Sequence, residues 1–204
     1  LMLMILFGSM VLFVGIRWRA LLGLAAVGLL LIPLGWNFLA EYQKERVLTF
    51  IDPERDPLGA GYHIIQSIIA VGSGGIFGKG FMKGTQSQLK FLPEQQTDFV
   101  FSVFAEEWGF MGALLLLVLM LSLILWGLKI AQHSRDYLGT LIAYGVTMLV
   151  FWGVFINVAM VLGILPVVGI PLPFFSYGGS SMVKMMVAMG LLMNVSMRRY
   201  VLQS

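Results

Sequence analysis

The chain has 204 residues, of which 59% are hydrophobic and only 11% are charged, whereas soluble domains average about 25% charged residues. This composition excludes an ordinary soluble domain and indicates an integral membrane protein. The net charge of +3, spread between apolar segments, is too small for a nucleic-acid-binding surface. Because the sequence has no cysteine, disulfides, thiol chemistry and cysteine metal sites are excluded as well.

The apolar segments predict a bundle of membrane helices. A helix rises about 1.5 Å per residue, so about 20 mostly apolar residues cross a hydrocarbon core of ~30 Å. One partial and four complete spans are predicted, at about residues 1–16, 20–40, 105–128, 137–165 and 176–197. The proline-rich run at 166–173 separates the last two, since closely spaced prolines cannot continue a helix. We therefore predict an all-α, polytopic membrane bundle that forms one domain over residues 1–204.

The chain opens inside an apolar run with neither a charged leader nor a small-residue cleavage site. We therefore expect additional membrane helices upstream of Leu1. Cations in the short connections predict which ends face the cytoplasm. These cations are Arg17, Arg19, Lys129, Arg135, Arg198 and Arg199. The loop at about 41–100 is then extracytoplasmic and the C-terminus is cytoplasmic.

The outer loop contains most of the polar residues of the chain. Together with the two glutamates just beyond it, the loop holds nine of the ten acidic residues. Apolar residues at 64, 65, 68, 69 and 71 follow helical spacing in a segment too short to span a bilayer. We expect an interfacial or re-entrant helix at 62–71, followed by a glycine-rich turn at 72–84.

The glycine-rich segment GSGGIFGKG (72–80) is not a nucleotide-binding loop. A Walker A motif requires Gly at 73 and Ser or Thr at 80, where Ser73 and Gly80 stand. A dinucleotide fingerprint fails at Phe77. The six glycines between 72 and 84 favour a tightly folded turn over direct phosphate contact. Lys79 and Lys83 are candidate partners for a diphosphate.

The segment LPEQQTDF (92–99) carries the candidate catalytic acid. Pro93 suits a first helical turn that leads into the next span. Asp98 is explained either as an N-cap of that helix or as a general base at the outer membrane face, one turn after Glu94. Its position among cations that can hold an anionic substrate argues for the second interpretation.

Three further charges lie in or near predicted spans. Glu106 and Glu107 are either partnered inside the membrane or solvated at its surface beside Trp108. Lys184 lies inside the last span, and we expect it to pair with one of these glutamates rather than to act in catalysis. His63 and His133 are predicted on opposite sides of the membrane, so they form no metal pair. Small residues at 178–181 predict close helix packing at the start of the last span.

Five motifs occur in order along nearly the whole chain and together closely resemble the SEDS family of membrane proteins. They are DPERDPLGAGYH (52–63), GSGGIFGKG (72–80), GTQSQLKFLPEQQTDF (84–99), AEEWG (105–109) and GILPVVGIPLPFFSYGGSS (163–181). The chain departs from the family at Gln96, where members often have His, and at Lys184, where members have an apolar residue.

This resemblance implies a ten-helix glycosyltransferase of the bacterial inner membrane, with the present chain as its C-terminal half. Such an enzyme polymerises lipid II into peptidoglycan strands during cell elongation and rod-shape maintenance. Its partners would be a class B penicillin-binding transpeptidase and the elongation machinery. The essential acidic residue of the family falls on Asp98.

The implied reaction needs a base and an anion site. We predict that Asp98 takes the proton from the acceptor hydroxyl while outer-loop residues bind the lipid-linked diphosphate. Candidate substrate-binding residues are Arg46, Lys79, Lys83, Gln88 and Glu94. A divalent cation such as Mg2+ is compatible with this chemistry, but the sequence assigns no ligands to it. Two alternatives stay open: a transporter that flips the lipid-linked precursor, using charges such as Glu107 and Lys184, and a scaffold that recruits a transpeptidase.

Overall fold

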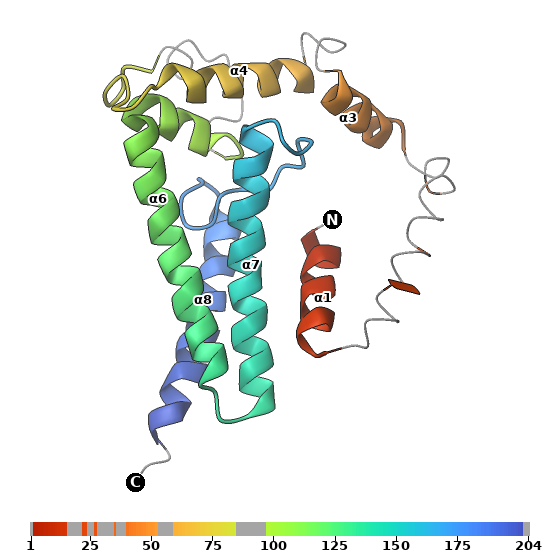
Figure 1. Cartoon of the computed structure of the whole chain (residues 1–204), viewed down its shortest axis with the longest axis vertical. Coiled ribbons are helices and arrows are strands. Elements are labelled where there is room, and N and C mark those ends of the chain that lie inside the picture. The colour runs from red at the N-terminus through yellow and green to blue at the C-terminus, as the bar shows by residue number, and fades with distance from the viewer. Residues whose placement is uncertain are drawn as a thin grey trace.

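In the computed structural model, the described residues are 2–15, 40–52, 59–84 and 97–201, with residues 22, 23, 27 and 35 described singly. The helices are α1 (Met2–Phe13), α3 (Glu41–Ile51), α4 (Ala60–Ser73), α6 (Val100–Gln132), α7 (Tyr137–Val161) and α8 (Gly179–Val201). Figure 1 shows α6, α7 and α8 side by side, with α4 lying across one end of the bundle. The predicted all-α fold is confirmed. The predicted span at 20–40 lies outside the described residues apart from the four single positions.

Three of these helices are long and apolar enough to cross a membrane: α6, α7 and residues Gly179–Arg198 of α8. Helix α7 ends four residues earlier than predicted, because Gly163 adopts a φ of +71° that ends helical geometry before the prolines begin. The chain then runs irregularly over residues 162–178 before α8 starts. This long connection, which we call the crossing loop, returns the chain to the bundle beside α6 and α7.

The predicted helix at 62–71 is confirmed as α4, and a buried serine attaches it to α7. The Ser67 hydroxyl, fully buried, lies 2.8 Å from the carbonyl of Val161, the last residue of α7. A hydrogen bond there satisfies one of the carbonyls that a helix C-terminus leaves without an intrahelical partner. Ile68 packs against Gly163, where a β-carbon would come within 2.8 Å of Ile68 Cδ1. Helix α4 therefore lies across the end of α7 rather than beside it.

Helix α6 is interrupted at Gly109, and the glycine-rich turn fills the interruption. Gly109 has φ 66° and ψ −168°, so the carbonyls before it and the N–H groups after it lose their helical partners. The Glu106 and Glu107 carbonyls instead accept hydrogen bonds from the backbone N–H groups of Lys79 and Gly80, both at 3.0 Å. The N–H groups of Phe110 and Met111 donate to the carbonyls of Gly75 (2.8 Å) and Ile76 (3.1 Å). The turn is therefore joined to α6 by four backbone hydrogen bonds.

Glycine is required where the two backbones meet. A β-carbon on Gly74 would collide with the carbonyl oxygen of Ala105, and one on Gly78 with that of Glu107. Gly78 also has a φ of +79°, which disfavours any side chain. Close packing against α6 thus explains two of the glycines in the turn, in agreement with the sequence prediction of a shaped turn.

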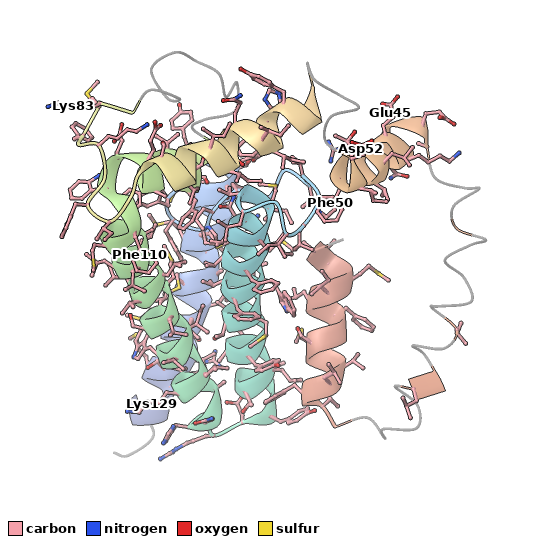
Figure 2. The ribbon with its side chains drawn as sticks, turned by 45° about the horizontal axis from the view of Figure 1, so that its top comes forward. Glu45, Phe50, Asp52, Lys83, Phe110 and Lys129 are labelled. Carbon is pink, nitrogen blue, oxygen red and sulfur yellow. The ribbon has the colours of Figure 1, made fainter. Side chains whose placement is uncertain are left out.

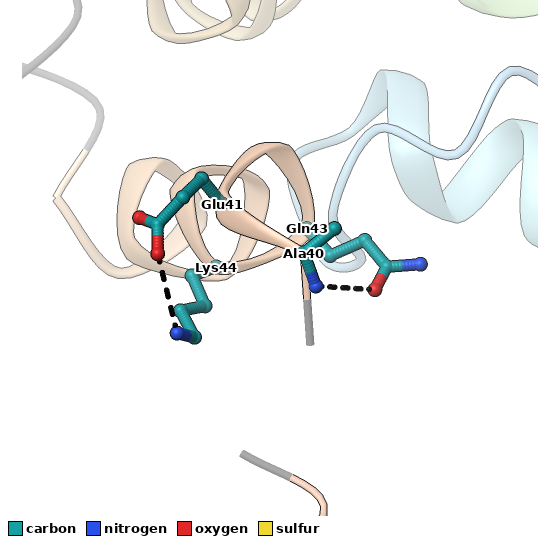
Figure 3. A network of polar contacts seen from close by, with 4 residues as sticks. All are labelled: Ala40, Glu41, Gln43 and Lys44. Atoms are coloured by element: carbon teal, nitrogen blue, oxygen red, sulfur yellow. Dashed lines mark hydrogen bonds and ion pairs between the residues drawn. The ribbon is translucent and has the colours of Figure 1, made fainter. Parts of the chain in front are cut away.

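Two helices flank the bundle. Helix α1 packs on α7, where Phe13 stacks on Tyr144 with ring centroids 4.0 Å apart. Helix α3 was not predicted. Its first turn contains a hydrogen bond from the Ala40 N–H to Gln43 Oε1 (3.2 Å) and an ion pair between Lys44 and Glu41 (3.4 Å), as Figure 3 shows. In a capping box, a Glu or Gln side chain three residues after the N-cap accepts a hydrogen bond from the N-cap N–H. Gln43 forms this half of the motif with Ala40.

One packing prediction is wrong. A β-carbon on Gly179 would have no atom within 4 Å, and Ser180 is exposed. The small residues at the start of α8 therefore make no close helix contact within the described part of the chain. The close crossing lies instead between α6 and α7 at Gly127, where a β-carbon would collide with the Thr147 hydroxyl.

Replacing Gly78 by alanine tests the junction between the turn and α6. We expect Gly78→Ala to destabilise the protein by about 1–3 kcal/mol, because it forces a left-handed conformation and a backbone collision. Thermal unfolding of the purified protein in detergent measures this. Gly72→Ala, in the open last turn of α4, is the matched control and should be neutral or stabilising. Equal stability of the two variants would contradict the proposed junction.

Candidate active site

Asp98 lies in the turn that immediately precedes α6. The residue at the N-cap position of α6 is Phe99, one residue after Asp98. Asp98 therefore does not occupy the N-cap position that the sequence suggested for it. Its side chain is half-buried, so burial against the bundle leaves part of the residue accessible. Asp136 in contrast is a true N-cap, whose Oδ2 accepts from the Gly139 N–H at 3.0 Å at the start of α7.

An asparagine of α7 holds the backbone on which Asp98 is carried. The Nδ2 of Asn157 donates to the carbonyl of Asp98 and to the carbonyl of Ile170, each at 2.8 Å. Asn157 is fully buried. One amide group thus joins the turn before α6 to the crossing loop.

The crossing loop also approaches the carboxylate of Asp98. A β-carbon on Gly169 would lie 3.3 Å from Asp98 Oδ2, and Gly169 has a φ of +69°. Because glycine has no side chain, the loop backbone can come close to this carboxylate without covering it.

Arg46 of α3 reaches the same loop. Its Nη1 donates to the carbonyl of Val167 at 3.3 Å. The carboxylate of Asp98, in the turn before α6, and the guanidinium of Arg46, on α3, therefore both border residues 167–170. This arrangement can accept a proton at one group and stabilise an anion near the other.

Glu106 is neutralised by Lys79 from the glycine-rich turn. Lys79 Nζ lies 2.7 Å from Glu106 Oε1, the glutamate is fully buried, and the lysine side chain is 28% exposed. Glu107 is only half-buried, so the two adjacent glutamates have different surroundings. The prediction that Lys184 pairs with one of them is wrong. The backbone bonds of the turn bring Lys79 to α6, while Lys184 is exposed on α8.

The other predicted binding residues are placed apart or lie outside the described residues. Lys83 is exposed at the end of the glycine-rich turn, and Figure 2 shows it on the opposite side of the molecule from Asp52 at the end of α3. The 14 residues of α4, about 20 Å long, separate that turn from α3. Gln88 and Glu94 lie outside the described residues. In the described part of the chain, no three His, Asp or Glu side chains are grouped so that they could hold a metal ion.

The sequence analysis missed Asn157 and Gly169. Asn157 is the only amide side chain in the apolar segment 137–161, and an amide in a predicted span requires a hydrogen-bond partner. The sequence therefore indicates that Asn157 needs a hydrogen-bond partner, but it does not indicate which residue that partner is. Gly169 had no distinguishing signal among the glycines of its loop.

The fold and this site define a multi-pass membrane protein whose candidate carboxylate lies at one end of a helical bundle. Residues 1–201 match the FtsW/RodA/SpoVE family of cell cycle proteins, and the chain belongs to this family.

Relatives with assigned activities cover the chain extensively. Peptidoglycan glycosyltransferase MrdB of Escherichia coli K12 is 52% identical over 203 residues, which are 98% of this chain and 55% of that protein. Peptidoglycan glycosyltransferase RodA of Treponema pallidum is 49% identical over 166 residues, which are 81% of this chain and 38% of that protein. The chain spans about half the length of the curated relatives it matches.

Two solved structures match the arrangement of the helices. A chain of a peptidoglycan synthase complex, described as coordinating polymerization and crosslinking, is 39% identical with a TM-score of 0.74 and covers 94% of this chain and 53% of that one. A mutant of the Thermus thermophilus rod shape determining protein RodA is 34% identical with a TM-score of 0.51 and covers 66% of this chain and 40% of that one.

The ion pair between Lys79 and Glu106 predicts coupled effects on stability. We expect Lys79→Met to destabilise the protein by about 1.5–3 kcal/mol, since it removes a charge-assisted bond to a buried carboxylate. In a Glu106→Gln background the same substitution should cost at least about 1 kcal/mol less. Thermal unfolding of the four proteins gives this coupling. Lys83→Met, at the exposed end of the same turn, should leave the unfolding temperature unchanged, and additive losses would contradict the pairing.

Proposed function

We propose that the protein is a peptidoglycan glycosyltransferase that polymerises lipid II into glycan strands during cell elongation. The observation that carries this proposal is that Asp98 and Arg46 both border one stretch of the crossing loop, residues 167–170. The activities assigned to its relatives support the same reaction. Asp98 is the proposed general base.

The chemistry requires one base and one anion site. A bond forms between the 4-hydroxyl oxygen of the acceptor sugar and the anomeric carbon of the donor, and the bond from that carbon to a polyprenyl diphosphate breaks. Asp98 accepts the hydroxyl proton. The diphosphate leaves as an anion, so it requires a cation rather than the acid that protonates an alcohol leaving group in glycosidases.

Arg46 is the proposed cation at the diphosphate. Its guanidinium has five N–H donors, so it can keep its bond to Val167 and still bind phosphate oxygens with the others. Further substrate contacts are proposed for Lys79, Lys83, Gln88 and Glu94. For Lys79, such a contact would have to coexist with its ion pair to Glu106.

We place the site on the extracytoplasmic side. The connection between α6 and α7, which carries Arg135, and the C-terminal end of α8 lie at the end of the bundle opposite α4 (Figure 1). Figure 2 shows Lys129 at that same end, far along α6 from Phe110. Because cations concentrate on the cytoplasmic side of membrane proteins, the end with α4 and Asp98 faces outward.

A transpeptidase is the proposed partner. The matched complex combines polymerization with crosslinking, and we propose that a class B penicillin-binding protein supplies the crosslinking activity here, within the elongation machinery. Transport of the lipid-linked precursor is less well supported than polymerisation. The transport hypothesis relied in part on Lys184 as a charge inside the bundle, but Lys184 is exposed on α8.

Substitution of Asp98 tests the general base. In the purified full-length protein, Asp98→Asn should lower the rate of glycan strand synthesis from lipid II by about 10²–10⁴-fold without loss of membrane insertion. Asp136→Asn is the matched control. It changes an N-cap that asparagine satisfies equally well, and it should retain full activity. Normal strand synthesis by the Asp98 variant in detergent, where transport between compartments has no meaning, would refute the assignment.

Substitution of Arg46 tests the anion site. Arg46→Met should raise the KM for lipid II by about tenfold, which corresponds to the loss of about 1.4 kcal/mol of binding free energy. Lys44→Met is the control, because Lys44 lies on the same helix and pairs with Glu41. The two variants remove the same charge, so an equal rise in KM would show that Arg46 has no specific contact.

A further inference from the structure

We propose that Asn157 is a positioning residue that sets the orientation of the Asp98 carboxylate through the backbone. This inference rests on the proposed function, in which Asp98 is the base. Asn157 lies one turn before the end of α7 and is fully buried. Burying an amide is unfavourable unless it forms hydrogen bonds, so its presence calls for a specific set of partners.

The partners are two carbonyl oxygens from segments without regular structure. Both N–H groups of the Asn157 amide are used, one for Asp98 and one for Ile170, at equal distances of 2.8 Å. Neither carbonyl belongs to a helix, so no ladder of backbone hydrogen bonds holds it in place. The bond from Asn157, a side chain on a helix, therefore helps to hold each segment in position.

The two contacts act on the same carboxylate from different directions. The Asp98 carbonyl is one bond from the Cα that carries the carboxylate side chain, so holding it restricts where the side chain can begin. Ile170 directly follows Gly169, the residue whose backbone approaches Asp98 Oδ2. Asn157 therefore holds both the origin of the side chain and the loop that forms one wall of its surroundings.

Only the donor end of the amide is used. Asn157 Oδ1 is buried and has no hydrogen-bond partner among the described residues. The two donors of the amide diverge from one nitrogen, so a single side chain can bind two separate segments. Leucine preserves the size of this side chain without its donors, and glutamine preserves the donors one methylene further out.

The test compares variants of the purified full-length protein in lipid II polymerisation. Asn157→Leu should lower kcat by about 10–100-fold, the effect of displacing a catalytic group by about 1 Å, with KM changed less than threefold. Asn157→Gln should recover part of this loss but stay at least threefold below the parent protein. Thr147→Val is the matched control, because Thr147 is a buried polar residue of the same helix whose hydroxyl bonds, among the described residues, to the carbonyl of Ala143 within that helix. It should leave kcat unchanged.

Two results would overturn the proposal. One is an Asn157→Leu protein with the kcat of Thr147→Val. The other is a loss in which kcat, KM and thermal stability all worsen together and glutamine restores nothing, which indicates a structural role. If Asn157→Leu fails to fold, the folded glutamine variant decides, and a kcat equal to that of the parent protein refutes positioning.

The outcomes for Asp98 separate this proposal from the assignment of the base. An inactive Asp98→Asn protein together with a fully active Asn157→Leu protein refutes positioning alone. An active Asp98→Asn protein refutes the proposed base and positioning with it. In the Asp98→Asn background, Asn157→Leu should cause no further loss of the residual activity, because a residue that acts through Asp98 has nothing left to position.

Discussion

The break in α6 at Gly109 is the constraint on which the arrangement of the outer segments depends. An interrupted helix inside an apolar bundle exposes backbone groups that need partners, and the glycine-rich turn supplies four of them. The turn can enter only because Gly74 and Gly78 let its backbone touch that of α6. Its docking brings Lys79 to the buried Glu106. It also fixes the C-terminal end of α4, whose middle is attached to α7 through Ser67.

The same principle of partners for buried backbone groups operates at the candidate site. The turn before α6 and the crossing loop are not helical, and each is bound by a side chain from a neighbouring helix. Asn157 of α7 holds both, and Arg46 of α3 holds the loop at Val167. Catalytic groups on such loops are useful only when a rigid element determines their position. Here α7 is that element, and it is itself capped at its start by Asp136.

Local features of the sequence were sufficient for much of the fold. Hydropathy placed α6, α7 and α8, helical spacing placed α4, and the prolines at 166–173 separated the last two helices. The ends of these helices were predicted less accurately than their positions. Helix α7, for example, ends before the first proline because Gly163 adopts a positive φ. Helix α3 was not predicted because its first six residues, EYQKER, contain no aliphatic side chain and its apolar residues are confined to the C-terminal half, so the segment lacks the apolar periodicity by which helices are recognised. The small residues at 178–181 were misjudged because composition does not say which helix lies opposite.

What the sequence by itself determined was the class of protein, the positions of its apolar helices and, through its motifs, the family and the candidate base Asp98. Those properties depend on composition and on order along the chain. The tertiary structure decided which charges and amides meet. Lys79 rather than Lys184 neutralises Glu106, because the turn enters the break in α6. Asn157 reaches Asp98 and Ile170 because α7 passes between two segments that are 59 and 13 residues away. A hydrogen bond acts over about 3 Å, so its partners are set by how helices cross, and no local pattern in the sequence records that.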